Sequence, residues 1–315
     1  MIIDAHQHVW DPGTRAHAWL DGLPALRRRF SAADYARVAA EHEVSASVLV
    51  QVLASAAETE EFLALAAAPG VIAGVVGWTD LTAPGVAAEI TRLRQLPGGG
   101  RLVGIRHLVQ DEPDPAWLDR REVRRGIRAV GDAGLAYDLL VHPAQLPAAL
   151  RLASDLGEMR FVLDHGAKPD IASGRLEPWS SLVAELACRP NVTCKLSGLV
   201  TEAAAGWTVP QVAPYARWLL ECFGPGRLMF GSDWPVCTLA ASYSQVLALA
   251  RETLGGHLGP AELDAVFAGN GVTVYGLAPA NPGDNPRNPG HNPANPGDNP
   301  RNPGHNPARG TSCGA

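Results

Sequence analysis

Eight short apolar runs, separated by segments with helical periodicity, constrain the fold of this chain more than any other feature. The runs read MIIDAHQHVW, SASVLVQVL, VIAGVVGWTD, LVGIRHLVQ, LAYDLLVHP, MRFVLDHGA, NVTCKLSGL and RLMFGSDWP. Between several of them lie segments such as AADYARVAAEHE, PGVAAEITRLRQL and REVRRGIRAVGDAG, which have apolar residues at three- and four-residue spacing. Strands that alternate with helices in this way predict a parallel sheet.

The size of the chain decides between two forms of such a sheet. With 315 residues, 46% of them hydrophobic, the chain suits either two ordinary domains or one large α/β barrel. Eight strands in roughly 230 residues match a closed barrel better than an open doubly wound sheet. No GxGxxG follows a strand, so nothing indicates a dinucleotide site. We therefore predict an α/β fold of the (β/α)₈ TIM-barrel type.

Residues 278–315 differ in composition from the rest of the chain. The sequence NPGDNPRNPGHNPA occurs twice in tandem, at residues 281–294 and 295–308. Such a segment cannot bury enough apolar surface to offset the entropy lost on ordering. We predict a barrel domain over residues 1–277 and a disordered tail over residues 278–315. His291 and His305 are interpreted as part of a solvated tail rather than as a metal or partner site.

Charge and cysteine content narrow the classes of partner. The formal net charge of −6 offers no basic stripe for phosphates, so we expect a small-molecule substrate and no nucleic acid. No run approaches the ~20 apolar residues of a membrane span, and the N-terminus lacks a signal-peptide pattern. The five cysteines are sparse and unpaired by spacing, which favours reduced thiols in a cytoplasmic protein. Whether the chain forms a homo-oligomer stays open.

Polar residues gather where the predicted strands end. Barrel enzymes place their chemistry at that position, where strands pass into βα loops. A single histidine is more often a hydrogen-bonded core residue than a ligand, and for His107 and His142 the two readings are equal, but eight strand ends together indicate an active site. The residues, in chain order, are His6 and His8, Gln51, Trp78 and Asp80, Arg106 and His107, His142, Asp164 and His165, Lys195 and Ser197, and Asp233.

The first run also carries a spacing pattern of its own. Asp4, His6 and His8 lie two residues apart, and successive side chains of a strand point to opposite faces. We therefore expect these three side chains to share one face, with Ile3, Ala5 and Gln7 on the other.

Taken in order, the motifs DAHQHVW, GIRHLVQ, YDLLVHP, LDHGAKP, CKLSG and FGSDWP resemble the amidohydrolase superfamily. Within it they resemble the lactonase branch of L-fuconolactonase-like and 2-pyrone-4,6-dicarboxylate lactonase-like hydrolases. The resemblance covers residues 1–277 and implies a (β/α)₈ hydrolase that opens cyclic esters of sugar acids or related carboxylic acids.

The chain departs from the two-metal members of that superfamily. Their bridging carboxylated lysine has no counterpart here, because the fourth run ends in Arg106 and His107 and the fifth in His142. The remaining set of His6, His8, His165 and Asp233 suits one divalent ion, zinc or manganese. Some members of the branch act without a metal, so the resemblance implies the ion here without requiring it.

Lactone opening needs a base, a group that polarises the ester carbonyl, and a pocket. Asp233 is the predicted base and proton shuttle, and His165 with the other imidazoles, with or without a metal, polarises the carbonyl or the water. Arg106 offers a planar fork for a substrate carboxylate or hydroxyls. The predicted pocket walls are His107, His142, Gln51, Trp78 and Trp234, with ordinary packing an equal alternative for the two tryptophans. For Lys195, orientation of a neighbouring carboxylate is favoured over contact with substrate.

Two other functions fit the same motifs. Related barrels decarboxylate aromatic or unsaturated acids with a zinc ion, and a barrel without activity could simply bind a sugar acid. Arg106 and the LDHGAKP run favour the lactonase. The intact set of His6, His8, His165 and Asp233 argues against a mere binding protein, which needs no base facing metal-type ligands.

Overall fold

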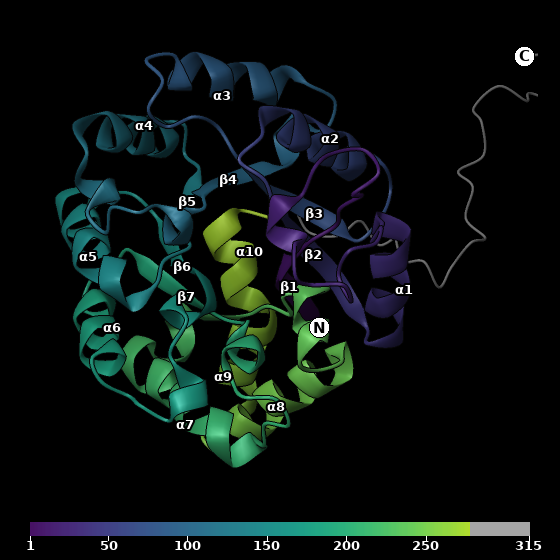
Figure 1. Ribbon diagram of the computed structural model, residues 1–315, viewed down its shortest axis with the longest axis vertical. Coiled ribbons are helices and arrows are strands. Elements are labelled where there is room, and N and C mark those ends of the chain that lie inside the picture. Colours follow the sequence, from purple (N-terminus) through teal and green to yellow (C-terminus); the bar gives the residue numbers. More distant parts are fainter. Residues whose placement is uncertain (278–315) are drawn as a thin grey trace, which may run out of the picture.

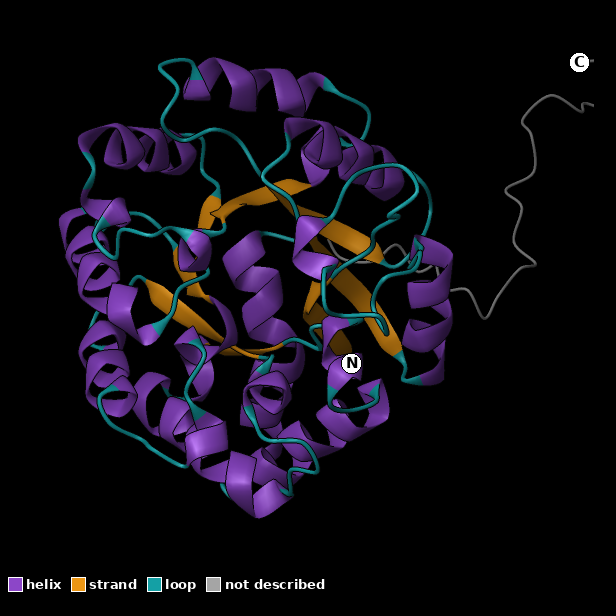
Figure 2. Cartoon of the chain, viewed as in Figure 1, coloured by secondary structure: helices purple, strands orange, loops and turns teal. Residues whose placement is uncertain are grey.

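The computed structural model describes residues 1–277, and these form a ring of strands enclosed by helices (Figures 1 and 2). The eight strands are parallel and follow one another in chain order around the ring. A bridge between Gln7 and Trp234 joins the first strand to the segment after the last. The predicted TIM barrel is confirmed, whereas the predicted tail lies outside the described residues. The strands are β1 (Ile2–Gln7), β2 (Val44–Val50), β3 (Ile72–Gly77), β4 (Leu102–His107), β5 (Ala136–Leu139), β6 (Phe161–Leu163), β7 (Val192–Leu196) and β8 (Leu228–Phe230).

The first eight helices alternate with the strands and form the outer layer of Figure 2. The first of them begins at a capping box, in which Ser31 and Asp34 satisfy each other's backbone N–H groups. The helices are α1 (Ala32–Glu41), α2 (Ala56–Ala67), α3 (Val86–Gln95), α4 (Arg121–Asp132), α5 (Leu146–Asp155), α6 (Trp179–Ala187), α7 (Val209–Phe223), α8 (Tyr243–Gly255), α9 (Pro260–Asp264) and α10 (Asn270–Tyr275). Within the described residues, no helix is long and apolar enough to cross a membrane.

Two hydrophobic cores hold this arrangement together. The larger core lies between strands and helices, and includes Leu49, Tyr137 and Phe161. The smaller core fills the barrel interior with residues such as Val48, Val76 and Val162. Each fully buried aliphatic or aromatic side chain of this kind contributes about 1.5–3 kcal/mol to the stability of the fold.

The end of the described chain closes one mouth of the barrel. In Figure 1, α10 lies across the centre of the ring. The side-chain amide of Asn270 donates to the carbonyls of Pro225 and Leu228, at 2.7 Å each, and so ties α10 to the start of β8. Tyr275 packs in the inner core. Because α10 covers the end where the strands begin, a substrate must enter at the other end, where they terminate.

Candidate active site

A bulge in β1 decides which of its side chains face the site. Asp4 pairs with Ser47 and Gln7 with Leu49, so three steps along β1 match two along β2. The extra residue is a β-bulge, which shifts the alternation of side chains by one position. The prediction that Asp4 shares a face with His6 and His8 is therefore wrong.

Asp4 points into the helix layer instead. Its carboxylate accepts hydrogen bonds from the hydroxyls of Tyr35 (2.8 Å) and Tyr243 (3.2 Å) and from the backbone N–H of Ser232 (2.8 Å). Tyr35 belongs to α1 and Tyr243 to α8. Asp4 thus anchors the strand to two helices, while the bulge turns the two histidines inward.

Three histidines and one carboxylate converge at the carboxyl end of the barrel, and we call them the histidine–aspartate group: His6, His8, His165 and Asp233. The Nε2 atoms of His6 and His8 lie 3.0 Å apart. Asp233 Oδ1 lies 3.3 Å from His8 Nε2 and 3.8 Å from His6 Nε2. Ligand atoms of His6, His165 and Asp233 all lie within 4.8 Å of one another. The structure therefore brings the predicted set together.

A left-handed turn after β6 places His165. Its φ of 53° is unusual for a residue with a side chain. Its Nδ1 lies 2.9 Å from the hydroxyl of Ser197, which follows β7. Next to that serine, a Cβ on Gly198 would come within 2.5 Å of His165 Nδ1, so only glycine permits the imidazole to lie so close.

Asp233 sits on the seam where the barrel closes. Its backbone N–H donates to the carbonyl of His6 at 2.8 Å, and its φ is 56°. Burial alone would raise the pKa of its carboxyl group. The interactions with His165, His8 and His6 outweigh burial, and the pKa lies below the ordinary value. Asp233 is therefore an ionised carboxylate at neutral pH.

Beside this group lies a second one, the fixed-charge cluster, formed by Arg106, Asp138, Asp164 and Lys195. Lys195 Nζ lies 2.6 Å from Asp138 Oδ2 and 3.0 Å from Asp164 Oδ1. Arg106 Nη1 donates to Asp164 Oδ2 at 2.9 Å. Two cations balance two carboxylates, as buried charges require. Lys195 thus fulfils the expected role of orienting a carboxylate.

The two carboxylates of this cluster titrate differently. Burial raises the pKa of Asp138 to about 6, even though Lys195 opposes the rise. Burial acts on Asp164 as well, but the charges of Lys195 and Arg106 and the hydrogen bond with His6 hold the pKa of Asp164 well below its usual value. Asp164 is therefore the permanently ionised member.

The two groups meet at His6. Its Nδ1 lies 3.1 Å from Lys195 Nζ and 3.4 Å from Asp164 Oδ1, and Arg106 Nη1 lies 3.3 Å from its Nε2. Burial, with the charge of Lys195 second, places the pKa of His6 well below its usual value. Burial likewise lowers the pKa of His165 to about 4. Both imidazoles are therefore neutral at pH 7, the form in which histidine binds metals.

These residues fit one divalent cation. Donor atoms of a tetrahedral zinc site are about 3.3–3.5 Å apart, close to the 3.0–3.8 Å separations among His6, His8 and Asp233. On the other side of the His6 ring, Nδ1 lies 3.4 Å from Asp164 Oδ1 and 3.1 Å from Lys195 Nζ. A carboxylate next to the second ring nitrogen is typical of metal-binding histidines.

Arg106 is held more tightly than the sequence implied. Besides Asp164, its guanidinium contacts the backbone carbonyl of Gln51 and, at 3.2 Å, the side-chain oxygen of Gln51. The fork expected to bind a substrate carboxylate is thus occupied by protein acceptors. Gln51 is fully buried, and its contacts with Arg106 fix the guanidinium.

The other predicted wall residues divide into three environments. Trp78 Nε1 donates to His107 Nδ1 at 3.0 Å, and His107 is stacked on Trp117 with 4.3 Å between ring centroids. His142 is exposed. Trp234 packs edge-on against Phe30 within the outer core, so ordinary packing accounts for this tryptophan.

Sequence reasoning missed Asp138 and Tyr275. The Tyr275 hydroxyl donates to Asp138 Oδ2 at 2.7 Å, and its ring lies 5.3 Å from Lys195 Nζ. The available signal was Asp138 itself, which lies inside the apolar run LAYDLLVHP. A carboxylate in a buried strand needs a cation as partner, so this position indicated a buried ion pair.

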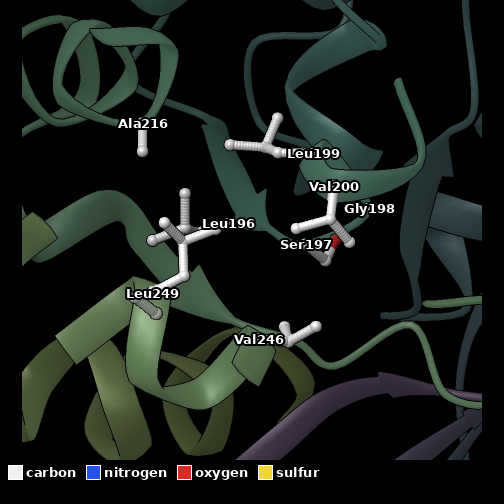
Figure 3. A pocket seen from close by; sticks show the side chains of 9 residues that line it. Leu196, Ser197, Gly198, Leu199, Val200, Ala216, Val246 and Leu249 are labelled. Carbon is white, nitrogen blue, oxygen red and sulfur yellow. The ribbon is translucent and has the colours of Figure 1, made fainter. Parts of the chain in front are cut away.

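A small apolar cavity lies behind Ser197, between β7, α7 and α8 (Figure 3). Its volume is about 20 Å³, which suits a single water molecule but not a lactone. It therefore lies outside the chemistry. Its lining includes Leu196, Leu199, Val246 and Leu249.

Comparisons with known proteins agree on one family. The model described as "Amidohydrolase" matches residues 3–277. L-fucono-1,5-lactonase of Burkholderia ambifaria is 40% identical over 277 residues, which cover 87% of this chain and 94% of the relative. The enzyme of the same name from Burkholderia multivorans is 37% identical over 289 residues, which cover 87% and 96%. A crystal structure of an amidohydrolase from Burkholderia multivorans with bound zinc is 36% identical, with a TM-score of 0.84 over 88% of this chain and 100% of that one.

Proposed function

The chain belongs to the amidohydrolase family, and from this premise we propose that it is a lactonase that opens a sugar-acid lactone with the aid of one divalent metal ion. The observation that carries the proposal is the histidine–aspartate group, in which three histidines face one ionised carboxylate at the open end of the barrel. The two lactonase relatives act on a six-membered 1,5-lactone by name, which favours that ring size.

His6, His165 and Asp233 are the proposed metal ligands, with His8 as a fourth donor. The zinc-bound relative supports zinc as the ion. When bound, a divalent cation polarises an ester carbonyl and makes water a stronger nucleophile. The low pKa of the two buried imidazoles keeps their nitrogens available for it.

Asp233 serves as the base and proton shuttle. Its carboxylate takes a proton from the attacking water as the new C–O bond forms at the carbonyl carbon. The bond from that carbon to the ring oxygen then breaks, and the leaving alkoxide receives the proton back from Asp233. The distances of 3.3 Å from Asp233 Oδ1 to His8 Nε2 and 3.8 Å to His6 Nε2 support a base that acts beside the metal-type ligands.

Arg106 and His165 complete the proposed catalytic set. Arg106 Nη1, 3.3 Å from His6 Nε2, contributes positive charge where the carbonyl oxygen becomes negative. The proposed wall residues are His107, the last residue of β4, and Trp78 and His142, which follow β3 and β5 at the open end. A cytoplasmic location is also proposed, and it is supported by four free cysteines among the described residues.

Acid release from a panel of lactones tests this function. The purified protein is assayed with L-fucono-1,5-lactone, five-membered aldonolactones and aromatic carboxylic acids, with a pH indicator and a carbon dioxide detector. Elemental analysis of the same preparation measures bound metal. We expect acid release from the six-membered sugar lactone well above its spontaneous hydrolysis, and loss of that activity after chelation. Carbon dioxide release from an aromatic acid without lactone opening would overturn the proposal in favour of a decarboxylase.

A further inference from the structure

A charged pair lies on the loops that follow β6 and β7, and the proposed reaction does not use it. Lys168 follows the left-handed turn after β6, and Glu202 ends the 3₁₀ turn Leu199–Glu202 after β7. Lys168 Nζ lies 3.7 Å from Glu202 Oε1, at the long end of the range for ion pairs. Their side chains are 21% and 23% exposed, so the pair is largely withdrawn from water without being sealed inside.

The backbone that carries Lys168 is strained. Four consecutive residues have left-handed φ values: His165 (53°), Gly166 (55°), Ala167 (62°) and Lys168 (51°). Each such residue other than glycine costs on the order of 1–3 kcal/mol, and strain of this kind concentrates at functional sites. Trp179 Nε1 holds the turn by donating to the carbonyl of Gly166 at 2.6 Å.

This turn fixes Lys168 relative to His165. The backbone N–H of Lys168 donates to the carbonyl of His165 at 2.9 Å, so the ammonium and the imidazole project from one rigid unit. The β7 loop is locked to the same unit, because Ser197 hydrogen-bonds His165 and Gly198 lies against its ring. Lys168 and Glu202 therefore hold fixed positions around His165.

Electrostatic effects show that the pair is close to the site. After burial, the charge of Asp233 is one of the causes that raise the pKa of Glu202, whereas Lys168 opposes that rise. The charge of Lys168 in turn contributes to the lowered pKa of His165 and of His142, in each case after burial. The geometry agrees with this, because Lys168 ends the turn that carries His165 and Glu202 ends the turn that follows β7.

The chemistry of a sugar lactone suits such a pair. A lactone of a monocarboxylic sugar acid is uncharged and carries several hydroxyl groups, each both donor and acceptor. A hydroxyl can accept a hydrogen bond from an ammonium and donate one to a carboxylate, and bonds to charged groups are the stronger kind. Because the pair is neutral as a whole, it does not select for an anionic substrate.

We propose that Lys168 and Glu202 form a subsite that binds the hydroxyl groups of the sugar-acid lactone, an inference that rests on the proposed lactonase function. Lys168 donates to a ring hydroxyl and Glu202 accepts from the same hydroxyl or its neighbour. A lactone without hydroxyls leaves both charges unsatisfied, and a site built to hydrogen-bond its substrate rejects such an analogue strongly. Glu202 also repels a lactone that carries an additional carboxylate.

The test compares two six-membered lactones, L-fucono-1,5-lactone and the unsubstituted δ-valerolactone. In Lys168→Met and in Glu202→Gln, kcat/KM for the sugar lactone is expected to fall at least tenfold, mainly through KM, while kcat/KM for δ-valerolactone changes less than threefold. Bound metal, measured by elemental analysis, stays unchanged. The matched control is Arg175→Met, which removes a more exposed ion pair with Asp170 and should alter neither substrate.

A second variant separates folding from binding. Lys168→Gly removes the ammonium and at the same time relieves the strain at a φ of 51°, so it should be at least as stable as the wild type. It is expected to lose the same preference for the sugar lactone. If the wild type opens both lactones and these variants lower both rates equally or not at all, the subsite is overturned. If the wild type opens neither lactone, the proposed function itself fails.

Discussion

Asp164 and Asp233 are two buried carboxylates at the same end of the barrel, and their neighbours give them opposite tasks. Asp164 is fully buried and faces Lys195 and Arg106, whose positive charges are permanent. Asp233 is 4% exposed and lies beside His6 and His8, and burial lowers the pKa of His6 and of the nearby His165. The charge of Asp164 is therefore compensated within the fold, whereas that of Asp233 is left for a metal ion or a proton. Compensated charge makes the fixed-charge cluster structural, and uncompensated charge makes the histidine–aspartate group reactive.

The largest effect is expected when the positive charge that balances Asp138 and Asp164 is removed. Lys195→Met leaves Asp138 and Asp164 buried without their shared ammonium, and loss of one partner of a buried ion pair costs about 3–5 kcal/mol of the free energy of unfolding. Urea denaturation measures this loss. The control is Arg151→Met, whose pair with Asp119 is exposed and worth at most about 1 kcal/mol. Equal stability of the two variants would contradict the description of the cluster as a compensated unit.

The next prediction concerns how His165 and Asp164 make the free energy of unfolding depend on pH. Burial lowers the pKa of His165 to about 4, so the unfolded chain takes up a proton below pH 6.5 more readily than the folded one. His165 should therefore destabilise the metal-free protein by on the order of 3 kcal/mol as the pH falls from 6.5 to 4. Asp138, whose pKa is raised to about 6, acts in the opposite direction over the same range, so the contribution of His165 is measured as a difference from a variant that lacks it. Asp164, whose pKa is lowered, loses its contribution only below its ordinary pKa of 3.8.

Unfolding free energies of the chelated protein between pH 7.5 and 4.5 measure this effect. His165→Asn is the matched variant, because asparagine tolerates the left-handed backbone and does not titrate. Its pH profile should be flatter than that of the wild type over this range. Parallel profiles would show that the imidazole is not held neutral by burial.

A third prediction concerns the uncompensated carboxylate. Asp233→Asn keeps the shape and the left-handed φ of 56° but removes the proton acceptor, so kcat for lactone opening should fall by roughly 10² or more. Steady-state kinetics on protein shown to be folded by circular dichroism, with bound metal determined, measure it. Asp80→Asn, which changes an exposed carboxylate bound to Thr82, is the control. A folded Asp233→Asn variant within about threefold of wild-type kcat would remove Asp233 from the mechanism.

The smallest effect concerns the residue that borders both groups. A lysine in place of Arg106 cannot reach Asp164 and both oxygens of Gln51 together, and lost hydrogen bonds of this kind cost about 1–2 kcal/mol. Thermal unfolding of Arg106→Lys measures the loss, which we expect without a large change in KM. A raised KM with unchanged stability would instead assign the guanidinium to substrate binding.

Much of this protein was predictable from sequence because its signals are local. Strand and helix periodicity depends on neighbouring residues. Seven of the eight predicted runs contain the observed strand, and the run SASVLVQVL begins one residue after the start of β2 at Val44. Parallel strands in a barrel bring their carboxyl ends together, so His6, His165 and Asp233 could be assigned to one site before any distance was known.

What the sequence by itself determined was the barrel, the end that carries the chemistry, and the residue types that meet there, since each follows from short-range pattern and chain order. Only the tertiary structure decided which way individual side chains point. A single extra residue in β1 turned Asp4 outward and His6 inward. Packing across the barrel assigned Arg106 to Asp164 and Gln51. Such outcomes depend on register and on partners distant in the chain, and a pattern of alternating residues does not encode them.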